Sequence, residues 1–526
     1  MLNVLIALLC LTSVVIVTAI EHGYGSSGVV VDAVKPIGNI TRFWVYTGFS
    51  PPEPREAAIE FLTSRDIEYN LALIGAVPLK GILFVRIHWL LELIIVKSLS
   101  VEGLFELDFA HLDTVIQLIV KNELHPVFEL MGNPSGVFSD INNNSTQIEL
   151  WKKIVTAVVS RYTTLYGVNE LSKWKFETWN EPDLKQYNVL NFTEAGYMKY
   201  VEASRAGLND AITKTNITLL YGGPAGLFKS KKKHKLCWKF LSHCSKHECN
   251  LNFISFHKKG NGSADKVVED SIEMLNIIKD MYNGTQPPPL ANTEADILSG
   301  WWRNESWRAD VRYAAAVSMV LAGFIDRLND DILILSNDNG FLNYHPHFFT
   351  QRTLFGRFQM NNTLDKHSQI FEKPVYSVMG ILAYLGNEKL RFASTFDNRL
   401  RIIASTSRFG SSSSTTSIIL VWSTDSMDIN TTLITIPVQV FLPNISGKYA
   451  VRTLQNTEPH PSAVWLEAGS PVYPDSDLRR KMRKAQVTNL RAFNVTFNEV
   501  LILWSDTEIE SRLFRRSDWK IQSSRF

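Results

Sequence analysis

The feature that most constrains the fold is a series of eight short apolar runs, each followed by a segment of helical periodicity. The centres of consecutive runs lie about 35 to 49 residues apart. The runs are Phe43–Phe49, Ile82–His88, His125–Leu130, Trp174–Trp179, Thr218–Gly222, Phe253–His257, Pro288–Thr293 and Ile332–Ser336. The helical segments include Leu107–Lys121, Thr146–Tyr162, Thr193–Thr213 and Asp265–Tyr282. Eight strand–helix units predict a (β/α)8 TIM barrel over residues 42–385, with a doubly wound open sheet as the alternative.

The pattern changes after the eighth unit. Four runs alternate like strands and are separated by clusters of Ser, Asn, Gly and Pro: Ser417–Trp422, Thr432–Phe441, Tyr449–Leu454 and Ala463–Leu466. They predict an accessory antiparallel β-sandwich over residues 386–485. A strand at Gly28–Ala33, within the N-terminal segment 20–41, is expected to join this sandwich. Two further strand-like runs lie within residues 487–504.

The N-terminus indicates export from the cytosol. Residues 1–19 are apolar almost throughout and end in a small-x-small pattern typical of signal peptide cleavage, with a signal anchor as the alternative. No later stretch reaches the ~20 apolar residues of a membrane span. A dozen N-x-S/T triplets lie in the remaining chain, so we expect an N-glycosylated protein that is lysosomal or secreted. Their acceptors are Asn39, Asn143, Asn144, Asn191, Asn216, Asn261, Asn283, Asn304, Asn361, Asn430, Asn444 and Asn494.

Charge and cysteine content narrow the classes further. The net charge of +2 implies no broad basic face, which argues against a nucleic-acid partner. Once Cys10 leaves with the signal peptide, Cys237, Cys244 and Cys249 remain, so at most one disulfide forms and one thiol is left over. The spacing of these cysteines and the neighbouring histidines fits no ordinary zinc site.

Two carboxylates are the candidate catalytic groups. Glu181 lies in WKFETWNEPD, where Pro182 cannot continue the ladder, so Glu181 is placed at the C-terminal mouth of the fourth strand. Glu294 ends the seventh strand, three barrel units later. Retaining glycosidases need two carboxyls about 5–5.5 Å apart, and this placement permits that spacing. Asp296 is the rival nucleophile. Because like charges raise one pKa of such a pair, Glu181 is expected to be the protonated partner.

Other polar and aromatic residues also fall at strand ends. Alone, each is more simply interpreted as a core residue or a solvated loop residue. Their convergence on one rim indicates a single pocket. They are Arg86, His88, His257, Lys258, Lys259, Trp301, Trp302, Asn337, Asp338, Asn339 and Arg352.

With these motifs in hand, the chain resembles glycoside hydrolase family 39. The matching stretches cover roughly residues 43–385 in order: FWVYTGFSPP, GAVPLKGI, VRIHWLLEL, FELMGNPSG, SKWKFETWNEPD, NTEADILSGWW, LSNDNGFLNYHPH and QRTLFGRFQMNNT. The resemblance implies a retaining exo-glycosidase that removes terminal α-L-iduronic acid from dermatan sulfate and heparan sulfate type glycosaminoglycans. It assigns Glu181 as general acid/base and Glu294 as nucleophile. It also implies sugar contacts from His88, Asn180, Lys259, Asp338, Arg352 and the backbone near Gly300 and Trp301.

The implied substrate suits the cations of the rim. A planar guanidinium binds a carboxylate bidentately, so Arg352 is the first choice for the uronate, with Lys259 as a second positive charge. A β-xylosidase-like activity is the alternative within the family, and an inactive secreted carbohydrate-binding homologue is the alternative outside enzymes. No cofactor or metal is called for, because two carboxyls and water suffice. The oligomeric state stays open.

The sequence departs from the family pattern in two places. Where the family tends to have a histidine after the first strand, this chain has Pro54-Arg55-Glu56. Members of the family also continue into a complete fibronectin-type-III-like domain, whereas residues 486–526 are interpreted as a truncated segment of it with an unmatched tail. Because two strands cannot close such a sandwich, Val500–Trp504 is expected to lack a partner strand and the chain to fold poorly.

Overall fold

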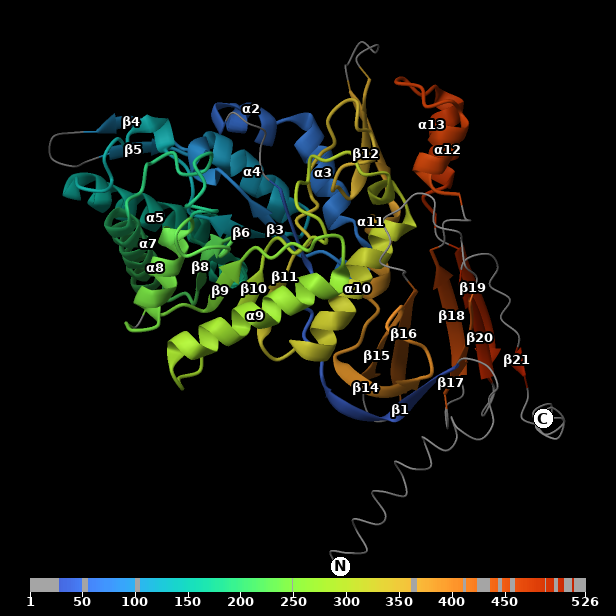
Figure 1. The fold of residues 1–526 in the computed structure, drawn as a ribbon. Helices are drawn as coiled ribbons and strands as arrows, with labels where there is room; N and C mark the ends of the chain where they lie inside the picture. The colour runs from blue at the N-terminus through green and yellow to red at the C-terminus, as the bar shows by residue number, and fades with distance from the viewer. Residues whose placement is uncertain are drawn as a thin grey trace, which may run out of the picture.

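The computed structural model describes residues 28–49, 55–99, 105–247, 249–360, 367–409, 413–422, 436–442, 447–454, 459–487, 489–495, 500–505 and 513–514. Figure 1 shows a strand-and-helix barrel with a second β-rich region beside it, which contains the C-terminal part of the chain. The expected signal peptide, residues 1–19, lies outside the described residues.

Eight parallel strands form the barrel, in the order β11-β10-β9-β8-β7-β6-β3-β2. A parallel bridge between Tyr46 and Ser336 brings the first strand to the last and closes the ring. The predicted (β/α)8 barrel is therefore confirmed, and the open sheet is excluded. The strands are β2 (Tyr46–Phe49), β3 (Phe84–Ile87), β6 (His125–Glu129), β7 (Lys175–Glu177), β8 (Leu220–Gly226), β9 (Phe253–Phe256), β10 (Leu290–Asn292) and β11 (Ile332–Leu335).

Several of the helices that surround the barrel begin at a residue whose side chain caps them. Asn144 accepts hydrogen bonds from the backbone of Thr146 and Gln147, and Thr193 accepts one from Gly196, so α5 and α7 each start one residue from their predicted positions. The helices are α2 (Ala58–Leu62), α3 (Arg65–Gly75), α4 (Ala110–Lys121), α5 (Ser145–Tyr166), α6 (Val168–Leu171), α7 (Glu194–Thr215), α8 (Lys235–Cys244), α9 (Ala264–Tyr282), α10 (Val311–Arg327) and α11 (Pro374–Leu382). Short 3-10 turns lie at Arg55–Ala57, Pro78–Lys80, Leu90–Leu93, Pro134–Gly136 and Ser306–Ala309.

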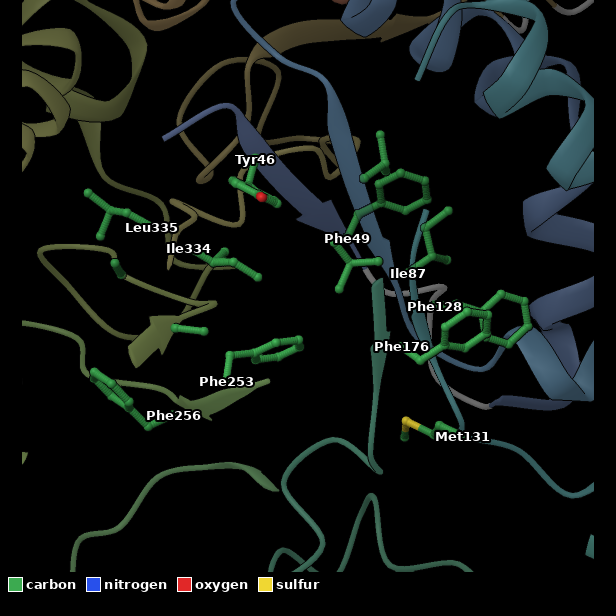
Figure 2. Close-up of a cluster of buried hydrophobic side chains, with 14 of the residues drawn as sticks. Tyr46, Phe49, Ile87, Phe128, Met131, Phe176, Phe253, Phe256, Ile334 and Leu335 are labelled. Carbon is green, nitrogen blue, oxygen red and sulfur yellow. The ribbon is translucent and has the colours of Figure 1, made fainter. Parts of the chain in front are cut away.

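Three barrel strands, β3, β6 and β7, carry charged side chains among their apolar ones. Figure 2 shows apolar side chains from β2, β3, β6, β7, β9 and β11, with Phe128 and Phe176 packed at 5.7 Å between ring centroids. Residues one position away on the same strands, Glu129 and Glu177, are charged and fully buried. Because successive side chains of a strand point to opposite faces, the strands that build the core also carry a charged layer on the other face.

The second β-rich region is built around a seven-stranded sheet in the order β16-β15-β14-β1-β17-β20-β21. Strand β1 (Gly28–Asn39) pairs with β14 and β17, so the predicted N-terminal strand does join this region. On β15, Leu400 and Ile402 belong to the core of the sheet, whereas Ile403 packs into the core of the barrel. The remaining strands are β14 (Glu388–Ser394), β15 (Leu400–Phe409), β16 (Ser413–Trp422), β17 (Ile436–Phe441), β20 (Val500–Ser505) and β21 (Leu513–Phe514), with a separate two-stranded antiparallel sheet of β18 (Gly447–Thr453) and β19 (Asn489–Val495).

Two predictions for this region are wrong, the first for the run 463–466 and the second for Val500–Trp504. The run 463–466, predicted as a strand, lies in helix α12 (Pro461–Glu467), which Pro461 and the His460 side chain begin. Together with α13 (Ser476–Lys484) it packs on the hairpin of β12 (Phe355–Gln359) and β13 (Ser368–Glu372), in a core that contains Trp465 and Met482.

The run Val500–Trp504 does not lack a partner, and the separate fibronectin-type-III-like segment is not confirmed. Strand β20 pairs with β17 along its length, from Val500 opposite Phe441 to Ser505 opposite Ile436, and β21 pairs with its other edge. The last described strands therefore complete the accessory sheet. A two-stranded sheet of β4 (Ile95–Leu99) and β5 (Phe105–Asp108) lies beside the barrel.

Cys244 and Cys249 form a disulfide and Cys237 is a buried thiol, which confirms the prediction of one bridge and one leftover cysteine. Among the described helices, none combines the length and the apolar character needed to cross a bilayer.

Candidate active site

The two candidate carboxylates lie at the C-terminal ends of their strands. Glu181 follows β7, with its backbone N–H donating to the carbonyl of Ala225 at 2.9 Å. Its φ of 40° is in the left-handed region, which a non-glycine residue adopts only where its surroundings hold it there. Glu294 follows β10, and the next residue, Ala295, donates its N–H to the carbonyl of Ser336 on the neighbouring strand end.

The two carboxylates approach one another closely. One carboxylate oxygen each from Glu181 and Glu294 and a ring nitrogen of His257 lie within 4.8 Å of one another. His257 Nδ1 lies 2.7 Å from Glu181 Oε1 and 3.5 Å from Glu294 Oε1, so the imidazole bridges the pair. This spacing is close to the separation of about 5–5.5 Å in retaining glycosidases. It is shorter than the separation of about 6.5–9.5 Å in inverting ones.

Buried cations surround Glu294. Lys259 Nζ pairs with Oε2 of Glu294, and Arg86 Nη1 lies 3.3 Å from Oε1. The spacing of Glu181, His257 and Glu294 would also suit metal ligands, but both oxygens of Glu294 already face a cation.

Arg86 also contacts two buried carboxylates besides Glu294. Its Nη2 lies 2.5 Å from Glu129 Oε1, and its Nε lies 2.5 Å from Glu177 Oε2. The same Nη2 donates to Oδ1 of Asn180 at 2.9 Å. A buried guanidinium with two carboxylates besides Glu294 offsets the large cost of burying an isolated charge and fixes the position of all its partners.

These contacts shift the pKa values of the pair by different amounts. Burial raises the pKa of Glu294, but basic side chains hold it well below its usual value; they are His257, Lys259, Arg86 and Arg352. Burial and the Glu294 charge also raise the pKa of Glu181. The hydrogen bond from His257, together with the positive charges of His257 and Lys259, outweighs them, so the pKa of Glu181 lies below its usual value. The expectation of a raised pKa at Glu181 is therefore wrong. Glu294 nevertheless has the lower pKa of the two, so it is the first to ionise as pH rises.

A second buried ion pair forms a wall of the candidate site near Glu294. Arg352 Nη2 donates to Oδ2 of Asp338 at 2.6 Å, and both side chains are buried. The Arg352 guanidinium lies 5.5 Å from the centroid of the Phe341 ring. Its Nε and Nη1 are buried with no hydrogen-bond acceptor among the described residues. Burial and the Glu294 charge raise the pKa of Asp338 to about 6, although Arg352 acts in the opposite direction.

Gly300 and Trp301 lie in the loop that reaches this wall. The N–H of Arg352 donates to the carbonyl of Trp301 at 3.0 Å, and the Trp301 ring stacks on Phe341 at 4.4 Å between centroids. Arg308 holds the loop, since its Nη1 donates to the carbonyl of Gly300 at 2.9 Å.

Asp296, the rival nucleophile, is already paired. Its Oδ2 accepts from Nη2 of Arg308 at 2.9 Å, and the side chain is 1% exposed. It is absent from the cluster that contains Glu181 and Glu294. Its carboxylate therefore supports the loop and is not positioned opposite the acid/base candidate.

The remaining predicted contacts lie around the two carboxylates. His88 Nδ1 pairs with Glu129, and its Nε2 lies 4.0 Å from Oε1 of Glu294. Asn180 has a buried Nδ2 without an acceptor among the described residues. Arg55, which replaces the family's histidine, pairs with Glu92 at 2.6 Å, so its guanidinium is partly engaged outside the predicted site.

Sequence reasoning named Arg86 and His257 as rim residues without giving them roles, and it missed Glu129, Glu177 and Arg308. The signal for the two acids was available, since a charged residue inside an apolar strand of a barrel points to a buried partner. Arg308 lies in a loop, where no periodicity marks it.

This geometry defines the class of protein: a TIM barrel with two facing carboxylates at its C-terminal rim, one ionised and surrounded by cations, is a glycoside hydrolase site of the retaining type. Comparison with known proteins gives the particular family. The sequence profile of Glycosyl hydrolases family 39 matches residues 27–497, and the chain belongs to that family.

Individual relatives agree with this assignment. Alpha-L-iduronidase of Mus musculus is 35% identical, with 92% of this chain and 86% of the relative aligned. Alpha-L-iduronidase of Homo sapiens is 34% identical, with 92% and 83% aligned. Among solved structures, a bacterial orthologue of human α-L-iduronidase superposes with a TM-score of 0.75 at 24% identity, covering 91% of this chain and 82% of the other. A monomeric β-xylosidase from Caulobacter crescentus superposes with a TM-score of 0.67 at 17% identity, covering 91% and 97%.

Proposed function

We propose that this glycoside hydrolase removes terminal α-L-iduronic acid from dermatan sulfate and heparan sulfate type glycosaminoglycans. The observation that carries the proposal is the buried Arg352–Asp338 wall near Glu294. There, Arg352 keeps two buried N–H groups without a hydrogen-bond acceptor among the described residues, and Lys259 adds a second cation. A sugar carboxylate would give this guanidinium a charged acceptor, whereas a neutral pentose would leave the Nε–H without one, at a cost of ~1–3 kcal/mol.

In the proposed mechanism Glu294 attacks the anomeric carbon while Glu181 gives its proton to the departing glycosidic oxygen. Glu181 then takes a proton from water, which attacks the same carbon and releases Glu294 from the glycosyl ester. His88, Asn180 and Asp338 would bind the hydroxyls of the sugar. Trp301 would form part of the pocket wall, and Gly300 would support it through its backbone. The mechanism uses no cofactor.

The β-xylosidase alternative has weaker support. The relatives called beta-xylosidase are 24% and 26% identical, the second over 34% of this chain, against 34–35% over 92% for three mammalian alpha-L-iduronidases. A xylose lacks the carboxylate that Arg352 and Lys259 would bind.

We also propose that the protein is N-glycosylated and resides in the lysosome or outside the cell. Eight of the predicted acceptor asparagines fall where exposure is described, and all eight are exposed. They are Asn39, Asn143, Asn144, Asn191, Asn216, Asn261, Asn283 and Asn304.

A substrate panel tests the proposed activity. We expect turnover of an aryl α-L-iduronide and little turnover of the matching aryl α-L-idoside or β-xyloside. Glu294→Gln should reduce turnover by at least about a thousandfold, and an activated fluorosugar should label Glu294 in the wild-type chain. Faster hydrolysis of the xyloside, or labelling of Asp296, would refute the proposal.

Specificity should depend on the Arg352 fork. Arg352→Lys keeps the charge but loses the planar pair of donors, so the preference for iduronide over idoside should fall about ten- to a hundredfold. The measurement is kcat/KM for both substrates. An unchanged preference would assign the carboxylate to Lys259 instead.

A further inference from the structure

The segment that leads from β8 into the first residue of α8 carries a dense cluster of positive charge. It contains five lysines within seven residues, in a chain whose net charge is only +2. All five are exposed, and none forms an ion pair with a carboxylate of the described residues. They are Lys229, Lys231, Lys232, Lys233 and Lys235.

This lysine segment, residues 229–235, lies at the rim that carries the candidate site. Strand β8 ends at Gly226, and the carbonyl of Ala225 accepts the backbone N–H of Glu181. Lys229 follows Ala225 by four residues, so the two Cα atoms are at most about 14 Å apart along the chain. The segment therefore begins close to the acid/base candidate.

The far end of the segment is fixed to the same loop. Asp183, two residues after Glu181, accepts hydrogen bonds from the backbone N–H groups of Leu236 at 2.7 Å and Cys237 at 3.0 Å. Both ends of the lysine segment are thus tied to the loop that presents Glu181, one through Ala225 and one through Asp183.

The segment is also ordered internally. The N–H groups of Lys233 and His234 both donate to the carbonyl of Ser230, and Nδ1 of His234 accepts from the N–H of Lys229 at 2.9 Å. The ammonium of Lys231 lies 5.4 Å from the centroid of the Trp238 ring. A compact turn keeps the positive charges together, so less conformational entropy is lost when they bind a ligand.

Position and charge together suggest a ligand. The general acid gives its proton to the glycosidic oxygen of the departing sugar. The departing chain must therefore pass the loop that carries Glu181. We propose that the lysine segment binds sulfate groups of the departing chain and forms a subsite for the sulfated glycan beyond the scissile bond. This inference rests on the proposed function, because the sulfated chain is the substrate proposed above. A solvated charge run elsewhere on the surface would have no such relation to the acid.

The test compares two charge-matched triple variants. Lys231→Gln/Lys232→Gln/Lys233→Gln removes the centre of the segment. Lys35→Gln/Lys121→Gln/Lys214→Gln removes three exposed lysines elsewhere, on β1 and at the ends of α4 and α7 that lead into the opposite end of the barrel. Each variant and the wild type are assayed on an aryl α-L-iduronide and on a sulfated oligosaccharide with a terminal iduronic acid.

We expect the segment variant to raise KM for the sulfated oligosaccharide about five- to twentyfold and to leave the aryl iduronide within twofold. These values follow from exposed ion pairs that each contribute a factor of about 1.4 to 5. Its kcat/KM for the oligosaccharide should also depend less steeply on salt than that of the wild type, because fewer counterions are displaced. The control variant should match the wild type on both substrates.

Equal KM values and salt slopes for the two variants would overturn the inference, as would equal losses on both substrates. Binding of a heparin-derived oligosaccharide, measured by calorimetry, gives the same comparison without turnover. Failure to cleave the aryl iduronide would refute the proposed function alone. Tighter binding of the wild type to anionic lipid vesicles than to the oligosaccharide would assign the segment to a membrane surface and refute the glycan subsite.

Discussion

Nζ of Lys373 lies 2.9 Å from the carbonyl oxygen of Gln351, the residue directly before Arg352. The same group contacts the carbonyl of Phe349 at 2.9 Å and the hydroxyl of Thr353 at 3.0 Å, and the side chain is 1% exposed. One buried amine therefore fixes three points of the segment that presents Arg352 to the pocket. Because Lys373 holds Gln351 and Thr353, the residues on either side of Arg352, the Arg352 backbone has little freedom to rotate.

Lys373→Met should disturb both stability and sugar binding. The two carbonyls would lose the Lys373 donor and the hydroxyl would lose one of its two donors, at a combined cost of about 2–5 kcal/mol, and the melting temperature should fall. Because the Arg352 segment would relax, KM for an aryl iduronide should rise more than kcat falls. Lys389→Met is the control, since Nζ of Lys389 also binds a backbone carbonyl and a carboxylate, those of Ile325 and Asp326, without supporting the pocket. A loss of stability with unchanged KM would limit Lys373 to a structural role.

The pKa order of the carboxylate pair predicts an acidic optimum. Glu181 must be protonated to act as an acid, and the contact with His257 holds its pKa below the usual value. As pH rises through that pKa the acid form is lost, so kcat/KM should fall toward neutral pH. Glu294, with its pKa lower still, remains ionised over the acidic range. The check is a pH profile of kcat/KM on an aryl iduronide.

Glu181→Gln supplies the control for this profile. With a leaving group too good to need a proton, the variant should keep much of its glycosylation rate and lose the decline toward neutral pH. With a sugar leaving group it should lose at least about a hundredfold, the usual contribution of a general acid. Similar losses on both kinds of substrate would contradict the acid assignment.

Asp338 should make binding of the uronate depend on pH. Its pKa is raised to about 6, first by burial and then by Glu294. Below that pH the neutral Asp338 no longer competes with the sugar carboxylate for Arg352, and above it the ionised form does. Ki of an iduronate-type inhibitor should therefore rise as pH increases through about 6. Asp338→Asn keeps an acceptor for Arg352 and should flatten this dependence, whereas an equal slope in both proteins would rule out Asp338 as its source.

The sequence predicted the parts of the fold that repeat. Eight apolar runs at near-constant spacing favoured a barrel over an open sheet, and the same periodicity placed Glu181 and Glu294 at strand ends. The run 463–466 was misassigned because a short apolar segment fits a strand or a helix equally well, and the cap at His460 with Pro461 was the missed signal.

Pairing across long separations could not be predicted. Strand β20 is partnered by β17, more than fifty residues earlier, and no local pattern in Val500–Ser505 names that partner. The same limit applies to the site. The pKa of Glu181 depends on His257, which lies 76 residues away in the chain, and only the folded geometry puts its ring against that carboxylate.

Gly48 on β2 provides a test of how tightly the pocket wall is packed. A Cβ at this position would lie 2.7 Å from Oδ1 of Asp338 and 3.0 Å from the carbonyl oxygen of Arg86, closer than side chains tolerate. In Gly48→Ala either Asp338 or the β3 backbone must move, and the ion pair with Arg352 moves with it. We expect a loss of about 1–3 kcal/mol in the free energy of unfolding, as for overpacking in a core. KM for an iduronide should rise as well.

Gly38→Ala on β1 is the matched control, because a Cβ there meets nothing within 4 Å. Measured by thermal melting and by kinetics, Gly38→Ala should resemble the wild type. If Gly48→Ala resembled it too, the wall would be loose enough to absorb a methyl group, and close packing of Asp338 could not be what orients Arg352.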